Sequence, residues 1–182
     1  MNMKVILKSA VWLRRGMRLA TVFASLCSLG LSAHGADSAV QVQLDTKKAS
    51  PRAVESLTER GILRDYRFAW TSLAQAFDVN SLDSLEGAFA GDAKQILRNT
   101  VLGQQRSGFT RQYLNQNHRL AAVFYAPEGD VMELHDTAEY ELRITDGGKI
   151  VHDEHVVMHF VVLMTPGADR WVIRRLQAVP QS

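Results

Sequence analysis

Val131–Ile144 reads VMELHDTAEYELRI, and this stretch decides the fold class. Apolar and polar residues alternate along it, as in an antiparallel strand with one face on a core and one face in water. The apolar face carries Met132, Leu134, Ala138, Tyr140, Leu142 and Ile144. Asp136 breaks the pattern, because its position places a carboxylate on that apolar face. A buried carboxylate needs a hydrogen-bond or ion-pair partner, so Asp136 is a candidate functional residue.

Three turns rich in glycine, proline and aspartate divide the C-terminal half of the chain into strands. The predicted strands are His118–Tyr125, Val131–Ile144, Lys149–Met164 and Arg170–Val179. Because short turns connect antiparallel neighbours, we expect a meander. Val156–Met164 is apolar except at His159, which predicts a central strand that is buried on both faces. Either a second copy of the chain or the N-terminal segment would then cover the outer face of the sheet.

Before Gly108 the apolar residues recur at helical spacing. Ser50 and Pro51 predict a helix start, with a break at Gly61. The strongest helix carries its apolar stripe at Tyr66, Trp70, Leu73, Ala74 and Phe77. A short segment capped by Asn80 and Ser81 follows, and then a helix from Gly91 to Ser107. Helices followed by strands predict an α+β fold, in which N-terminal helices pack on a curved antiparallel sheet.

Residues 1–36 have the layout of a secretory signal peptide: a basic start, an apolar run over 19–33 and then small residues. The run is shorter than the roughly 20 apolar residues of a spanning helix. We expect cleavage after Gly35 or Ala36, take Asp37 as the mature start, and predict a periplasmic or secreted protein without a stable membrane anchor. Cys27 follows Leu26 rather than a small residue, which disfavours a lipid anchor. Both Sec and twin-arginine export stay open.

Removal of residues 1–36 changes the charge balance. The segment holds five of the 21 Lys and Arg residues and none of the 19 Asp and Glu residues, which leaves 16 basic against 19 acidic, a net charge of −3. This balance argues against a nucleic-acid partner. Cys27 is the only cysteine, so the mature chain has no disulfide and no thiol nucleophile. Residues 37–50 are predicted to form a linker or an edge strand, and residues 51–182 a single domain.

Trp70 in the strongest helix, Gly91 before a later helix and Trp171-Val172-Ile173 in the last strand resemble the nuclear transport factor 2-like superfamily, with its SnoaL-like and cystatin-like relatives. The resemblance covers Arg64 to Val179. It implies a cone-like α+β barrel that encloses a pocket, commonly in a homodimer. The superfamily includes isomerases, cyclases and dehydratases, which usually place an aspartate and a histidine or tyrosine inside the cone, and many proteins without catalysis. Asp136 is the positional match for that aspartate.

The sequence offers Asp136 and His159 as catalytic candidates. Asp136 would act as an acid or base, or else form a structural hydrogen bond or a salt bridge to Arg174 or Arg175. A two-residue loop at Gly147-Gly148 places Asp136 opposite His159. A three-residue loop from Asp146 instead pairs His135 with His159 on the outer face. The second register matches apolar residues better, which argues against an Asp136–His159 dyad.

Aromatic residues and one arginine are candidates for lining a ligand pocket, although core packing is their alternative role. They are Tyr66, Trp70, Tyr113, Tyr140, Trp171 and Arg175. His152 and His155 face opposite sides of a strand, so we predict no metal site, and we predict no cofactor.

No nucleophile elbow, phosphate loop, dinucleotide fingerprint or zinc-protease motif is present in the sequence. We therefore expect an exported, non-catalytic domain that binds a small apolar ligand or a protein partner, with a homodimer through the sheet face. The alternative is an isomerase, cyclase or dehydratase that uses Asp136 as its acid or base.

Overall fold

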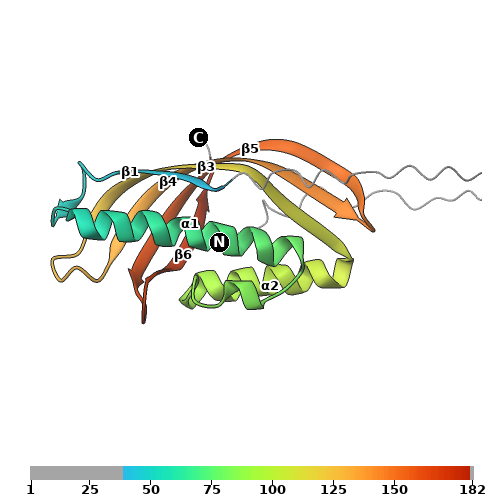
Figure 1. Cartoon of the computed structure of the whole chain (residues 1–182), viewed down its shortest axis with the longest axis horizontal. Helices are drawn as coiled ribbons and strands as arrows, with labels where there is room; N and C mark the ends of the chain where they lie inside the picture. The colour runs from blue at the N-terminus through green and yellow to red at the C-terminus, as the bar shows by residue number, and fades with distance from the viewer. Residues whose placement is uncertain (1–38, 181–182) are drawn as a thin grey trace, which may run out of the picture. The chain divides into compact units, whose positions relative to one another are not determined.

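The computed structural model describes residues 39–180. Two α-helices lie on one face of a six-stranded mixed sheet (Figure 1). The elements in chain order are β1 (Gln41–Asp45), β2 (Ser50–Pro51), α1 (Ser56–Asp78), the 3-10 turn η2 (Asp83–Leu85), α2 (Gly91–Ser107), β3 (Phe109–Tyr125), β4 (Met132–Asp146), β5 (Lys149–Pro166) and β6 (Trp171–Val179). The predicted α+β class with helices packed on a sheet is confirmed. The predicted signal peptide lies outside the described residues.

The sheet has the order β1-β3-β4-β5-β6 and does not close on itself. Strands β3 to β6 are antiparallel neighbours, as the short turns predicted. β1 and β2 both pair with β3 in parallel. Of the two predictions for residues 37–50, the edge strand is therefore correct over Gln41–Asp45, where Val42 faces the core.

Helix α1 is continuous from Ser56 to Asp78, so the predicted break at Gly61 is wrong. Its stripe of Tyr66, Trp70, Leu73 and Phe77 is buried as expected. The predicted helix start at Pro51 is also wrong. Ser50 and Pro51 are extended, because they pair with the end of β3 before the chain enters the helix.

Helix α2 covers Gly91–Ser107, as predicted, and Gly108 ends it in a left-handed conformation with φ 76°. β3 then begins at Phe109, well before the predicted His118. Polar residues between Thr110 and Asn117 hide this part of the strand in the sequence. An irregularity between Leu114 and Asn117 interrupts its alternation further.

The hairpin between β4 and β5 differs from both predicted registers. The turn is the two-residue Gly147-Gly148, with Asp146 opposite Lys149. A bulge follows between Ile144 and Thr145, where Val151 has no partner on β4, and it shifts the pairing by one residue. Beyond the bulge, Asp136 lies opposite Phe160 and Thr137 lies opposite His159.

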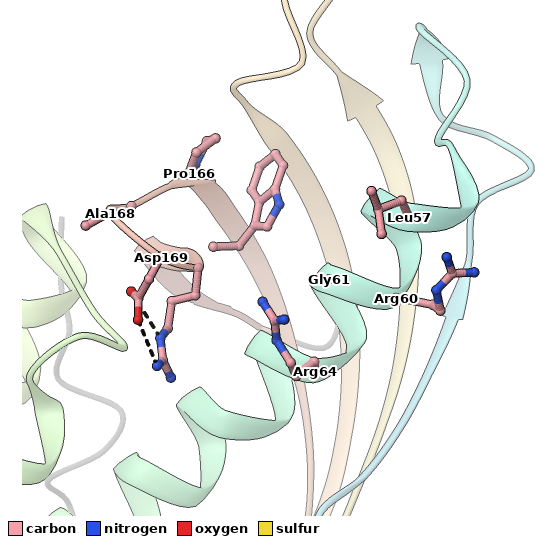
Figure 2. Close-up of a pocket in the computed structure, with 10 residues that line it drawn as sticks. Leu57, Arg60, Gly61, Arg64, Pro166, Ala168 and Asp169 are labelled. Carbon is pink, nitrogen blue, oxygen red and sulfur yellow. Dashed lines mark hydrogen bonds and ion pairs between the residues drawn. The ribbon is translucent and has the colours of Figure 1, made fainter.

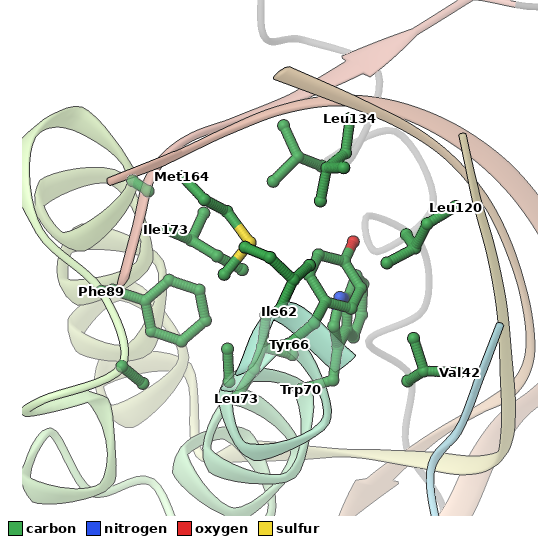
Figure 3. Close-up of a cluster of buried hydrophobic side chains, with 14 of the residues drawn as sticks. Val42, Ile62, Tyr66, Trp70, Leu73, Phe89, Leu120, Leu134, Met164 and Ile173 are labelled. Atoms are coloured by element: carbon green, nitrogen blue, oxygen red, sulfur yellow. The ribbon is translucent and has the colours of Figure 1, made fainter. Parts of the chain in front are cut away.

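A single apolar core fills the space between the helices and the sheet (Figure 3). Ile62, Tyr66 and Trp70 enter it from α1, and Leu134 and Met164 enter it from the sheet. Ile173 of β6 bonds through its backbone to Ala88 and Ala90, which ties the segment before α2 to the sheet edge. The core therefore fixes how α1 is rotated against β3 and β4, where a buried polar cluster lies.

Candidate functional site

Asp136 lies at the centre of a buried polar cluster. The hydroxyl of Tyr66 donates a hydrogen bond to Oδ2 of Asp136 over 2.8 Å. Nδ1 of His118 is hydrogen-bonded to the same oxygen, also over 2.8 Å. Each of the three residues is at most 2% exposed. The cluster joins α1, β3 and β4, because each element contributes one of its members.

Aromatic rings close around this cluster. The ring centroids of Trp70 and His118 are 4.2 Å apart, and Tyr66 meets His118 edge-on at 5.6 Å. Burial raises the pKa of Tyr66 well above its usual value, and the nearby Asp136 carboxyl raises it further. The phenol thus keeps its proton and remains a donor. A carboxylate joined to an imidazole and a phenol has the components of an acid–base site.

Three atoms in and beside the cluster lack hydrogen-bond partners among the described residues. They are Oδ1 of Asp136, Nε2 of His118 and Nε1 of Trp70. Buried polar atoms normally form hydrogen bonds, so these three unsatisfied atoms are unusual. They leave the cluster with unused hydrogen-bonding capacity inside a closed core.

His159 does not belong to the cluster. It lies on the opposite face of the sheet, where its Nδ1 is 3.2 Å from Oγ1 of Thr137. The Asp136–His159 dyad is therefore not formed, because the bulge in β5 pairs the histidine with an outward residue. The histidine of the cluster is His118, which was not among the predicted site residues, although it shares the alternate spacing of the buried Leu120 and Ala122.

The predicted salt bridge from Asp136 to an arginine of β6 is also wrong. A register shift between Leu163 and Met164 leaves Arg174 without a partner on β5, and both arginines are exposed. Arg174 donates to Oγ1 of Thr165. Arg175 lies 3.8 Å from Asp92 at the surface, so it does not line a pocket with the aromatic residues.

Four of the predicted pocket aromatics form one connected group in the core. Trp70 lies 6.2 Å from Tyr140, and Tyr140 lies 5.3 Å from Tyr113, between ring centroids. Tyr66 lies 6.5 Å from Trp70. These contacts are those of core packing. Trp171 is separate from the group and lies at a surface groove.

This groove, of about 550 Å³, runs between the N-terminal half of α1 and the β5–β6 turn. Figure 2 shows Leu57, Arg60 and Arg64 on the helix side, with Pro166, Ala168 and Asp169 on the turn side. A neighbouring hollow continues it past Asp65, Phe68 and Arg170. None of the Asp136 cluster lines either space.

The groove combines apolar surface with arginine side chains. Leu57 is 75% exposed, and a Cβ at Gly61 would meet the indole of Trp171 at 3.8 Å. Arg170 stacks over the ring of Phe68 at 4.1 Å. Arg60 is exposed and has no ion-pair partner among the described residues. An aliphatic side chain of a ligand could pack on the apolar surface of this groove, and a carboxylate of the same ligand could bind to an arginine.

Buried Asp65 holds the two sides of the groove together. Its Oδ2 accepts the backbone N–H of Trp171 over 2.8 Å, and its Oδ1 accepts from Nε of Arg64 over 2.7 Å. This contact links α1 to the first residue of β6. No local sequence pattern predicts it, since residues 65 and 171 are far apart in the chain.

No protein-family model and no curated protein sequence matches this chain. Among solved structures, the intermembrane space region of the chloroplast protein ARC6 is similar with a TM-score of 0.57 and 12% identity, over 72% of this chain and 100% of that chain. This likeness supports the fold alone. Within residues 39–180, neither helix is long and apolar enough to cross a membrane.

Two further structures are similar at lower TM-scores. A variant of Rv3472, a protein of unknown function from Mycobacterium tuberculosis, has a TM-score of 0.42 and 13% identity, over 71% of this chain and 79% of that chain. A de novo designed β-sheet protein has a TM-score of 0.34 and 15% identity, over 66% of this chain and 88% of that chain. Neither carries a functional argument.

Proposed function

We propose that this chain is an exported, non-catalytic domain that binds an acidic, partly apolar segment of a partner protein in the groove between α1 and the β5–β6 turn. The observation that carries the proposal is the composition of that groove. Exposed Leu57 and the indole of Trp171 line it together with three arginines, Arg60, Arg64 and Arg170. The Asp136 cluster, in contrast, is closed to solvent.

The charges of the groove favour a carboxylate. Three arginines face two aspartates, and those aspartates are already used: Asp65 bonds to Arg64, and Asp169 bonds to Arg170. Arg60 has no such partner among residues 39–180. A guanidinium binds a carboxylate through two parallel hydrogen bonds, so Arg60 is the first contact for an acidic residue of a partner.

The shape of the groove favours a protein segment over a small apolar ligand. A small ligand is held by a pocket that buries most of its surface, whereas this groove is lined on only two sides, by one helix and one turn. An extended segment can place one apolar side chain on Leu57 and Trp171, and its next acidic residue beside Arg60. Of the two ligand classes that the sequence predicted, the protein partner fits better.

A cone-like nuclear transport factor 2-like fold, with export directed by residues 1–36, is part of this proposal. Helices on the inner face of a long antiparallel meander support it, as does the inward position of Asp136. In this interpretation the Asp136 cluster occupies the place of the polar residues inside a cone, and aromatic side chains fill the space that would otherwise be the pocket. A periplasmic or extracellular partner is then expected.

A peptide-display selection on the purified protein tests the groove. We expect selected peptides to combine Asp or Glu with a large apolar residue, and to bind about tenfold more weakly to Arg60→Gln and to Leu57→Asn. Arg119→Gln and Leu102→Asn are matched controls, because both residues are exposed on other elements. Peptides without acidic residues, or equal loss in the controls, would contradict the proposal.

Acid–base catalysis at Asp136 is a second candidate function. The unpartnered Oδ1 of Asp136 and Nε2 of His118 favour it, since a substrate could use both atoms. This function requires an opening to the cluster. Reaction of the native protein with diethyl pyrocarbonate tests for one: modification of His118 at the rate of exposed His135 would support it. Complete resistance of His118 in the native protein would exclude it, because no substrate could then reach the cluster.

A further inference from the structure

Half of strand β5 has a free edge. β5 spans 18 residues and β6 only nine, and β6 pairs with β5 only from His159 to Pro166. Lys149–Met158 is bonded to β4 on one side and to no described strand on the other. Three apolar residues of this stretch are exposed, namely Ile150, Val151 and Val157. A free edge presents unpaired backbone N–H and C=O groups to another strand.

Strand β6 does not cover that edge. It runs toward the free edge but finishes at Val179, opposite His159, and Pro180 follows it. Proline lacks the N–H that a ladder needs, so the pairing does not continue at this position. The N-terminal side joins the sheet through β1, at the opposite end of the strand order.

We propose that a second copy of this chain pairs antiparallel with the free edge of β5, across a two-fold axis at Glu154. Antiparallel pairing of identical strands gives a closed dimer, since each residue contacts its counterpart reciprocally. The proposed register places Asp153 of each copy opposite His155 of the other. It also brings Val157 of each copy beside Val151 of the other, which covers both exposed valines.

Complementary polar side chains on the outer face support this register. Within one copy, Nη2 of Arg143 lies 3.0 Å from Asp153, and Nε2 of His155 lies 3.4 Å from Glu139. Joining Asp153 to His155 of the other copy therefore extends these contacts into one polar row across four strands, from Arg143 of one copy to Glu139 of the other. The two-fold axis repeats this row, so each dimer contains it twice.

The same register has one unfavourable contact. Glu154 lies on the axis, so its carboxylate faces that of its own counterpart on the inner side of the sheet. Like charges directly opposite each other destabilise a strand pair. The proposal thus makes an unusual prediction: neutralising Glu154 strengthens the dimer, although the substitution removes a charged residue from the interface.

Sedimentation equilibrium of the protein purified after expression of the full-length chain tests the pairing. We expect a reversible dimer with a dissociation constant below about 100 µM. Val157→Lys should raise its dissociation constant about tenfold, and Glu154→Gln should lower it about fivefold. Val79→Lys is the matched control, because Val79 is an exposed valine at the end of α1. Its dissociation constant should equal that of the parent protein.

Hydrogen exchange locates the interface independently. Alternate amides between His152 and Met158 should become protected as the protein concentration passes through the dissociation constant. A monomer at about 100 µM overturns the proposal. A dimer that Glu154→Gln does not strengthen, or one without added protection in this stretch, also overturns it and assigns dimerisation to another surface, such as the outer face of the sheet.

Discussion

At the scale of single residues, Asp136 shows how a buried acid is made compatible with a core. An isolated buried carboxylate costs several kcal/mol, so its stability depends on the groups around it. Here those groups come from α1 and β3, and both bond to the same oxygen, Oδ2. Asp136 therefore joins three elements, and the loss of either partner should affect the whole domain.

Tyr66→Phe should destabilise the fold by about 1–3 kcal/mol, because it leaves Oδ2 of a buried carboxyl with one partner fewer while the ring still fills its space. Urea unfolding followed by circular dichroism measures the change. Tyr113→Phe is the matched control, since the hydroxyl of Tyr113 forms no hydrogen bond with a described residue, and we expect a change within about 0.5 kcal/mol. Equal losses in the two variants would show that the bond to Asp136 contributes nothing specific.

The inward position of Asp136 was predictable, whereas its partners were not. Strict alternation in β4 places residue 136 on the apolar face, and its 2% exposure confirms this. Contact with His118 depends on the register of β3 against β4, and contact with Tyr66 depends on how α1 is rotated. Both are long-range properties. The catalytic role predicted for Asp136 stays a prediction.

At the scale of elements, Gly61 connects the continuity of α1 to the groove. Glycine inside a helix favours the unfolded chain, which is the reason that a break was predicted there. The helix continues through Gly61 because the residues of the next turn, Ile62, Asp65 and Tyr66, are buried and hold it in place. The small side chain also leaves the indole of Trp171 open toward the groove.

Gly61→Ala should therefore stabilise the domain by about 0.5–1 kcal/mol. The added Cβ would meet Trp171 at 3.8 Å, which is ordinary van der Waals contact, so no strain offsets the gain in helix propensity. Thermal unfolding measures the effect. Gly108→Ala is the opposing control: its φ of 76° is unfavourable for alanine, and we expect a loss of similar size. A destabilised Gly61→Ala would mean that the Trp171 side of the groove cannot adjust.

Periodicity predicted the type of most elements, and irregularities account for most of the errors. Strands β4 to β6 and helix α2 lie close to their predicted bounds, since their patterns are regular. The bulge beside Val151 moved the β4–β5 pairing, and the irregular region near Asn115 hid the start of β3. Each of these two register shifts inserts a single extra residue into one strand. An alternation pattern that is averaged over many residues does not detect such an insertion.

At the scale of the whole molecule, the proposed export is the property that would most limit where a partner can be. If residues 1–36 direct export, the mature protein should begin at Ala36 or Asp37, which the intact mass of protein recovered from the periplasm or medium measures directly. Ala33→Gln should slow processing and leave a larger, cell-associated form, because the signal peptidase requires a small residue near the cleavage site. Protein retained in the cytoplasm at its full length would contradict the assignment.

The aromatic core predicts how the whole domain responds to alkali. Burial raises the pKa of Tyr66, with Asp136 adding to the effect, and burial raises the pKa of Tyr140, with Tyr113 adding to it. The folded protein thus holds at least two protons that the unfolded chain releases near pH 10. The resulting stability is present below pH 10 and is lost as pH rises above it, at up to about 1.4 kcal/mol per pH unit for each tyrosine.

Urea unfolding at a series of pH values from about 9 to 11 measures this slope. In Tyr66→Phe the loss of unfolding free energy per pH unit above pH 10 should be smaller by the contribution of one proton. The reason is that residue 66 no longer carries a phenol that titrates in the unfolded chain. A parent protein whose stability is flat across this range would show that solvent reaches the tyrosines in the native state. That result would also reopen the Asp136 cluster as a site accessible to substrates, since Tyr66 bonds directly to Asp136.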